Sequence, residues 1–167
     1  MGRATLIGLM GILSGPATAG DLTGIYGGVQ LGQLDGRVSA QGRGSIGGVF
    51  IGYNNDNDRV VLGGELDYNT MDIDLGGVAR IDGLARLKLR GGYLVGDAFL
   101  YGTAGAAMVA ANPLKDSGYV FGAGIGYDLG NRMSLGSELL YHDIRDINNS
   151  GQDAEIITLS ARLAFQF

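Results

Sequence analysis

Residues 157–167, with the sequence ITLSARLAFQF, decide the fold of this chain. The odd-numbered positions of this stretch are all apolar, and small or polar residues stand between them: Thr158, Ser160, Arg162, Ala164 and Gln166. Successive side chains of a β-strand point to opposite faces, so this alternation predicts one strand whose two faces meet different surroundings.

The same period of two recurs along the chain beyond Gly20. It predicts eight strands, at residues 23–32, 45–54, 59–70, 81–94, 98–110, 118–129, 133–143 and 155–167. Short connections at 55–58, 95–97 and 130–132 alternate with longer polar ones of about 8 to 12 residues around Asp35, Asp72, 112–117 and 145–153. Short turns on one side and longer loops on the other are typical of an outer-membrane barrel.

Composition excludes several other classes of protein. The chain has 32 glycines among 167 residues, too many for a helical protein, and only two prolines, too few for collagen. A net charge of −5 argues against a nucleic-acid partner, whose phosphates would require clustered Lys and Arg. With no cysteine, the sequence offers no disulfide, thiol nucleophile or cysteine-based zinc site.

The first 19 residues are expected to be a signal peptide. Arg3 precedes an apolar run at 4–14, which is too short to span a bilayer as a helix, and Ala17 and Ala19 form a small-x-small cleavage site. A buried N-terminal helix is the alternative, but Pro16 would break it. We therefore expect a signal peptide at 1–19 and one barrel domain at 20–167.

The chemistry of the two faces indicates which side of the barrel meets lipid. One face of each strand is apolar, and the other carries glycine, small residues and charge. A soluble lipocalin-like barrel would place the polar face outside, whereas a membrane barrel places it inside. Glycine fits the interior of a barrel this small, and tyrosines near strand ends fit an interfacial girdle: Tyr53, Tyr68, Tyr93, Tyr127 and Tyr141. We expect an all-β, eight-stranded antiparallel up-and-down transmembrane β-barrel.

The inward face gathers the candidate functional residues into one charge network: Glu65, Asp67, Arg86, Lys88, Arg90, Glu138 and Arg162. Buried charges must be paired, and side chains fill the lumen of an eight-stranded barrel, so we interpret the set as a structural plug. The alternative is a gated polar pathway, that is, a narrow porin-like channel.

Several motifs resemble the small outer-membrane β-barrel family of proteobacterial surface proteins, the porin-family or OmpA- and OmpX-like barrels. They are TGIYGG at 23–28, GYN at 52–54, GELDY at 64–68, RGGY at 90–93, GAGIGY at 122–127 and ELLY at 138–141. Two positions depart from the family pattern, because Leu139 replaces an aromatic residue and Phe50 stands at an inward position that is commonly polar.

The resemblance implies an outer-membrane location in a Gram-negative bacterium, and contact with lipid and lipopolysaccharide. It implies that Leu163, Phe165 and Phe167 form the C-terminal signal for the barrel-assembly machinery, with periplasmic chaperones as earlier partners. It also implies a monomer with a structural or surface-interaction role, in envelope integrity, adhesion or antigenic display. The host or surface ligand stays unknown.

Other chemistry finds little support in the sequence. A less favoured alternative is a lipid-modifying enzyme, which mass spectrometry of lipid A would reveal. The only histidine, His142, lacks the serine two residues on that some outer-membrane deacylases carry. Asn54, Asp56, Asp58 and Glu65 have the spacing of a calcium loop, but Arg59 stands where that loop requires glycine. We therefore expect no catalytic residues, cofactor or metal.

Overall fold

The computed structural model describes residues 22–37, 41–73, 83–111, 114–144 and 154–167, which form eight β-strands. They are β1 (Gly24–Arg37), β2 (Gln41–Asn57), β3 (Val60–Ile73), β4 (Gly83–Val95), β5 (Ala98–Ala111), β6 (Leu114–Gly130), β7 (Met133–Ile144) and β8 (Ala154–Gln166). The expected signal peptide, with Ala17 and Ala19, lies outside these residues. No helix of the described residues is long and apolar enough to cross a membrane.

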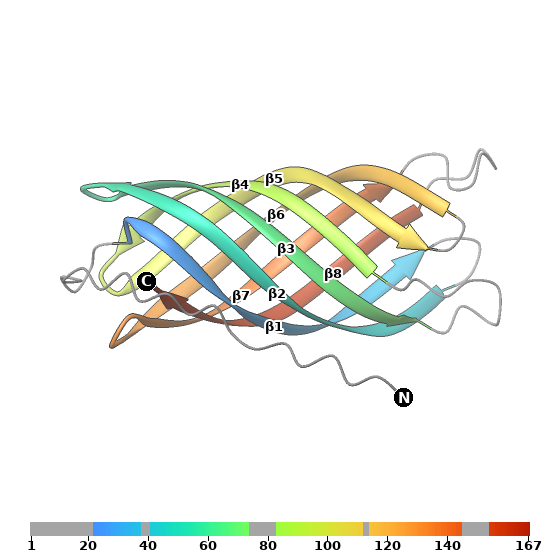
Figure 1. Ribbon diagram of the computed structural model, residues 1–167, viewed down its shortest axis with the longest axis horizontal. Coiled ribbons are helices and arrows are strands. Elements are labelled where there is room, and N and C mark those ends of the chain that lie inside the picture. The colour runs from blue at the N-terminus through green and yellow to red at the C-terminus, as the bar shows by residue number, and fades with distance from the viewer. Residues whose placement is uncertain (1–21, 38–40, 74–82, 112–113, 145–153) are drawn as a thin grey trace, which may run out of the picture.

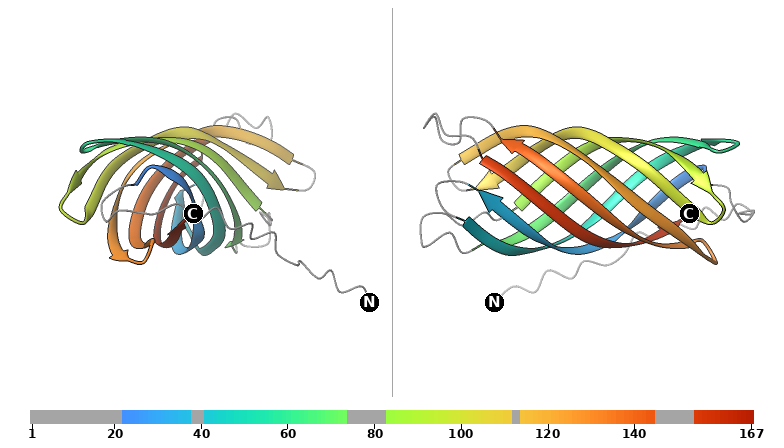
Figure 2. Two further views of the ribbon diagram at one scale, coloured as in Figure 1. Left: turned by 60° about the vertical axis from the view of Figure 1, so that its left-hand side comes forward. Right: turned by 180° about the vertical axis from the view of Figure 1, so that it is seen from behind.

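The strands close into a barrel in the order of the sequence. Each strand pairs antiparallel with the next, and β8 pairs with β1, so no strand edge is left open. Figures 1 and 2 show the strands inclined to the long axis of the barrel, as closure requires. The three short hairpins and the C-terminus lie together at one end, which we call the short-turn end (left in Figure 1).

Two-residue turns build the short hairpins, so the turns predicted at 55–58, 95–97 and 130–132 are shorter than expected. Asn131 and Arg132 have φ of 54° and 64°, and two positive values suit a type I′ turn between right-twisted strands. Gly96, with φ of 61°, is the first residue of the turn between β4 and β5.

The strands also extend further towards the opposite end than the sequence predicts. Asp35, expected in a loop, lies in β1 opposite Arg43, and Asp72 lies in β3 opposite Ser45. The sequence missed these strand ends because apolar and polar residues no longer alternate there, although the backbone hydrogen bonds between the strands continue. The loop expected at 112–117 is likewise wrong in part, because residues 114–117 belong to β6 and pair with β5, while residues 112–113 and the connection expected at 145–153 lie outside the described residues.

The apolar face of the barrel is the outer one. Leu31 and Leu89 are 71% and 72% exposed, whereas the interior residues Glu65 and Lys88 are at most 1% exposed. This arrangement confirms the membrane orientation of the faces and excludes the lipocalin-like alternative. The five tyrosines expected in the interfacial girdle are all exposed: Tyr53, Tyr68, Tyr93, Tyr127 and Tyr141.

Apolar side chains close the lumen towards the end opposite the short turns. These residues are 7% exposed or less: Leu34, Ile46, Leu84, Ala107, Val120, Leu140 and Ile156. They come from seven different strands and lie on the inward face near the ends that face away from the short hairpins. Buried polar side chains share these registers, since Asn69 faces Leu84, His142 faces Val120 and Thr158 faces Leu140. The interior therefore changes along the axis, from mainly apolar at this end to charged in the middle.

Inward glycines make room for the larger side chains beside them. In the register, Gly105 faces Lys88, Gly124 faces Glu138, and Gly136 faces Arg162. A Cβ on Gly124 would overlap the ring of Tyr101, whereas a Cβ on Gly126 would meet no atom within 4 Å. The absence of a side chain at Gly124 is therefore required by the Tyr101 ring, whereas the position of Gly126 has room for a side chain.

These two glycines provide a matched test of interior packing. Gly124→Ala should lower the free energy of unfolding by about 1–3 kcal/mol, because the Tyr101 ring must move. Gly126→Ala should leave stability unchanged within about 0.5 kcal/mol or raise it slightly. Urea titration of the protein in lipid vesicles, followed by heat-modifiable gel migration, measures both; equal losses would contradict this account.

Candidate functional site

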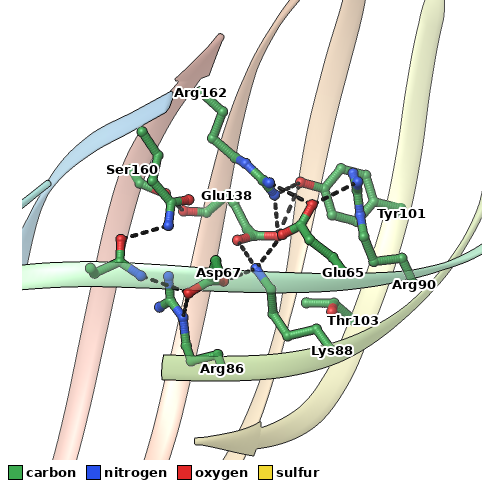
Figure 3. Close-up of polar contacts among 12 residues, drawn as sticks. Glu65, Asp67, Arg86, Lys88, Arg90, Tyr101, Thr103, Glu138, Ser160 and Arg162 are labelled. Carbon is green, nitrogen blue, oxygen red and sulfur yellow. Dashed lines mark hydrogen bonds and ion pairs between the residues drawn. The ribbon is translucent and has the colours of Figure 1, made fainter. Parts of the chain in front are cut away.

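Four strands bring the seven expected charged residues together inside the barrel (Figure 3). Glu65 and Asp67 project from β3, three cations from β4, Glu138 from β7 and Arg162 from β8. Residues two apart on a strand share a face, so each pair or triplet enters the lumen together. None of the seven is more than 9% exposed.

The register between β3 and β4 sets opposite charges directly against one another. Glu65 pairs with Lys88, and Asp67 pairs with Arg86. The Arg86 Nε lies 2.7 Å from the Asp67 Oδ1, and the Lys88 Nζ lies 2.8 Å from the Glu65 Oε1. Directly opposite residues are the closest neighbours across two paired strands, and here both pairs of opposite charges are buried.

Lys88 is the centre of the network. Its Nζ lies within 2.9 Å of three carboxylates, those of Glu65, Asp67 and Glu138, at 2.8, 2.9 and 2.7 Å. The side chains of all four residues are fully buried. One ammonium group therefore joins β4 to β3 on one side and to β7 across the lumen.

Arg162 joins the same two glutamates from β8. Its Nη2 lies 2.6 Å from the Glu65 Oε2, and its Nη1 lies 2.7 Å from the Glu138 Oε1. Arg90 adds a weaker contact, with its Nη1 3.1 Å from the Glu65 Oε2. The ion pairs thus form one connected network across the lumen, from Arg86 to Arg90.

Two tyrosines complete the network, and sequence reasoning missed both. The Tyr26 hydroxyl donates to Glu65 at 2.8 Å and accepts from Arg90 at 2.5 Å. The Tyr101 hydroxyl donates to Glu138 and accepts from Arg162, both at 3.1 Å. Their positions relative to Gly28 and Thr103, two residues on along the same strands, could have revealed that they point inward.

Arginine side chains also stack on aromatic rings inside the lumen. The Arg90 guanidinium carbon lies 3.9 Å from the centre of the Tyr101 ring, and that of Arg162 lies 4.0 Å from the centre of the Phe50 ring. Both distances suit a cation–π interaction. Phe50, an unexpected residue for an inward position, therefore contributes a surface for Arg162.

A polar chain extends the network towards the apolar closure. Asn69 donates to Asp67 and accepts from Gln30, both at 2.6 Å. His142 lies 3.2 Å from Arg86 through Nε2 and 3.2 Å from the carbonyl of Ile156 through Nδ1. A guanidinium can only donate and a carbonyl can only accept, so these contacts fit a neutral ring with its proton on Nδ1.

The arrangement fits mutual neutralisation better than catalysis or metal binding. Glu65, the twelfth position of the calcium-like spacing, directs its carboxylate to Lys88, Arg90 and Arg162. No group of three or more histidine, aspartate or glutamate side chains in the described part of the chain could hold a metal ion. The carboxylates of the network face cations, and His142 is 1% exposed.

A cavity of about 490 Å³ lies between the network and the short-turn end. Tyr26, Phe50, Arg90, Tyr101 and Arg162 contribute to its wall. Glu65, Lys88 and Glu138 do not line it, because the arginines and aromatic rings lie between them and the cavity. The lumen thus has three levels: an apolar closure, a charged layer and a cavity.

Known proteins with similar sequences are outer-membrane proteins. Residues 5–167 match the family described as "Outer membrane protein beta-barrel domain". A "31 kDa outer-membrane immunogenic protein" of Brucella melitensis is 28% identical over 169 residues, covering 81% of this chain and 70% of the relative. The protein of the same name from Brucella suis shows the same values.

Among solved structures, the crystal structure of Neisserial surface protein A has a similar fold. It superposes with a TM-score of 0.61 at 15% identity, covering 87% of this chain and 98% of the other. At that identity the likeness concerns the fold of the barrel.

Removing a carboxylate should expose how strongly the network depends on pairing. Glu138→Ala should lower the free energy of unfolding by about 3–5 kcal/mol, because Lys88 and Arg162 each lose a buried partner. Glu155→Ala, which removes an exposed carboxylate from β8, should change it by less than about 0.5 kcal/mol. Urea unfolding in lipid vesicles measures both, and equal effects would show that the buried pairs contribute little.

Proposed function

This chain belongs to the outer-membrane β-barrel family, and from that membership and its charge-filled interior we propose a structural or surface-interaction protein with a closed lumen. Its location is the outer membrane, where the apolar outer face meets lipid. The single observation that supports closure is the connected network of buried ion pairs from Arg86 to Arg90. Envelope integrity, adhesion and antigenic display are the roles we propose for such a barrel.

The orientation we propose places the short-turn end in the periplasm and the opposite end at the cell surface. Outer-membrane barrels of a single chain carry their short turns on the periplasmic side. The Brucella relatives are named immunogenic, and a protein of the same family presented at the surface would be open to antibodies. This orientation supports antigenic display by the connections at the opposite end.

Catalysis is not part of the proposed function. The network carboxylates are neutralised by cations, and His142 faces Arg86 and a backbone carbonyl. An enzyme acting on lipid would need a reactive group that the lipid can reach. We propose instead that the interior charges hold the barrel together, as a monomer whose lipid and lipopolysaccharide partners lie against the outer face.

A narrow channel is the alternative, and it is testable by conductance. Side chains fill the middle of the lumen, so no continuous water path should exist. The purified protein in planar lipid bilayers should therefore show no stable conductance steps. Reproducible porin-like steps from a folded, heat-modifiable preparation would overturn the closed lumen and leave the barrel assignment intact.

We also propose that the end of β8 is the assembly signal. Leu163, Phe165 and Phe167 share the outer face and are 39–40% exposed. The rings of Phe165 and Phe167 pack edge to face, with their centres 5.5 Å apart. Exposure on one face of the terminal strand makes these side chains available to the barrel-assembly machinery after periplasmic chaperones release the chain.

Phe167→Ala separates recognition from folding. The variant should accumulate in the outer membrane at roughly a tenth of the wild-type level or less, because tenfold weaker recognition corresponds to a loss of about 1.4 kcal/mol and unassembled chains are degraded. It should still fold into detergent micelles unaided. Phe121→Ala, which removes an outward ring from β6, is the matched control and should assemble normally. Equal assembly of both variants in cells, scored by heat-modifiable migration, would refute the signal.

A further inference from the structure

The cavity at the short-turn end has a size and lining suited to a small ligand. Its volume of about 490 Å³ lies within the range of small-molecule sites. Phe50, Phe99 and Leu94 provide apolar wall, and Arg90 and Arg162 provide charge. Such a mixture of apolar surface and a few convergent polar groups is typical of binding sites.

The buried charges beside this cavity do not balance. Among the described residues, the buried charged side chains are four cations, Arg86, Lys88, Arg90 and Arg162, and three carboxylates. The contacts of His142 fit a neutral ring. The seven ion-paired side chains therefore carry one positive charge in excess, in a setting where an unbalanced charge is expensive. Asp56, a half-buried residue of β2 with one buried carboxylate oxygen, belongs neither to these ion pairs nor to the wall of the cavity.

The excess lies at the cavity. Arg86 and Lys88 each form an ion pair with Asp67. Arg90 contacts one carboxylate, that of Glu65, at 3.1 Å. Arg162 and Lys88 bind the same carboxylate at the shorter distances of 2.6 and 2.8 Å. The Arg90 Nε is buried and has no hydrogen-bond partner. The side chains of Arg90 and Arg162 keep 8% and 5% exposure, and both line the cavity.

The other charged groups of the cavity lie near its mouth. Asp97 and Asp128 come from the turn regions, where Asp97 accepts from the Tyr127 hydroxyl at 3.4 Å and Asp128 accepts from the Gly130 amide at 2.8 Å. Arg132 lies in the turn between β6 and β7. These groups are not in the buried layer, so water screens them more strongly than the two arginines.

We propose that this cavity binds a small organic anion that enters from the short-turn end. The charged group of the anion lies against Arg90 and Arg162 and balances the excess positive charge. Its apolar part lies against Phe50 and Phe99, whose rings already contact the arginines. If the orientation proposed above holds, the ligand enters from the periplasm. The charged layer next to the cavity prevents the ligand from passing through the barrel.

Benzoate is a suitable probe, since it joins a carboxylate to an apolar ring, and benzamide is its uncharged counterpart. The folded protein, labelled with ¹⁵N at arginine and held in zwitterionic micelles, should show saturable shifts of the Arg90 and Arg162 Nε–Hε resonances with benzoate. Benzamide should produce no saturable shift. No saturation with benzoate, or equal binding of benzamide, would overturn the proposal.

Two glycine variants test the location without touching the ion pairs. Gly126→Phe fills the cavity from a wall position where a Cβ meets no atom within 4 Å, and should weaken benzoate binding at least about tenfold. Gly102→Phe adds the same ring to the exposed outer face of β5 and should leave binding unchanged. Heat-modifiable migration establishes that both variants fold. Undiminished benzoate binding by folded Gly126→Phe would place the anion elsewhere and overturn the site.

Discussion

The neutralisation of charge inside a closed barrel governs the rest of this structure. Seven ionised side chains project into a lumen from which side chains exclude most of the water, so each requires an opposite charge within reach. Lys88 meets this requirement for three carboxylates at once, and Arg162 for two. Because these contacts join β3, β4, β7 and β8 across the lumen, they also hold strands on opposite sides of the barrel at fixed positions relative to one another.

The remaining features of the interior follow from accommodating these long side chains. Glycine faces the bulky residues in the register, and the tyrosine hydroxyls of Tyr26 and Tyr101 supply hydrogen bonds that the ion pairs leave unmade. Towards one end mainly apolar side chains pack the lumen, and at the short-turn end a cavity lies against Arg90 and Arg162. A barrel built in this way meets lipid with its apolar outer face and is held together by ion pairs inside.

Much of this arrangement could be predicted from alternation alone. The period of two assigned Leu89 to the lipid face and Lys88 to the lumen, and the same parity placed all seven charged residues inside. The prediction did not include Tyr26 and Tyr101, because an aromatic residue is compatible with either face of a membrane strand, although the period of two places both of them inside. Strand ends were also missed, since Asp35 and Asp72 resemble loop residues, yet their backbones continue the ladder.

The sequence by itself determined the faces, the number of strands and the class of surroundings on each side, because these depend on side-chain order along one strand. The tertiary structure decided which charges meet. Glu138 and Arg162 lie 24 residues apart and Arg162 and Glu65 lie 97 apart, and these pairs become contacts only when closure and register bring β8 beside β7 and opposite β3. The count of four buried cations against three carboxylates follows from the sequence, but the position of the excess beside the cavity is decided by the closed barrel, because Arg90 has only a longer contact to a carboxylate that Lys88 and Arg162 bind more closely.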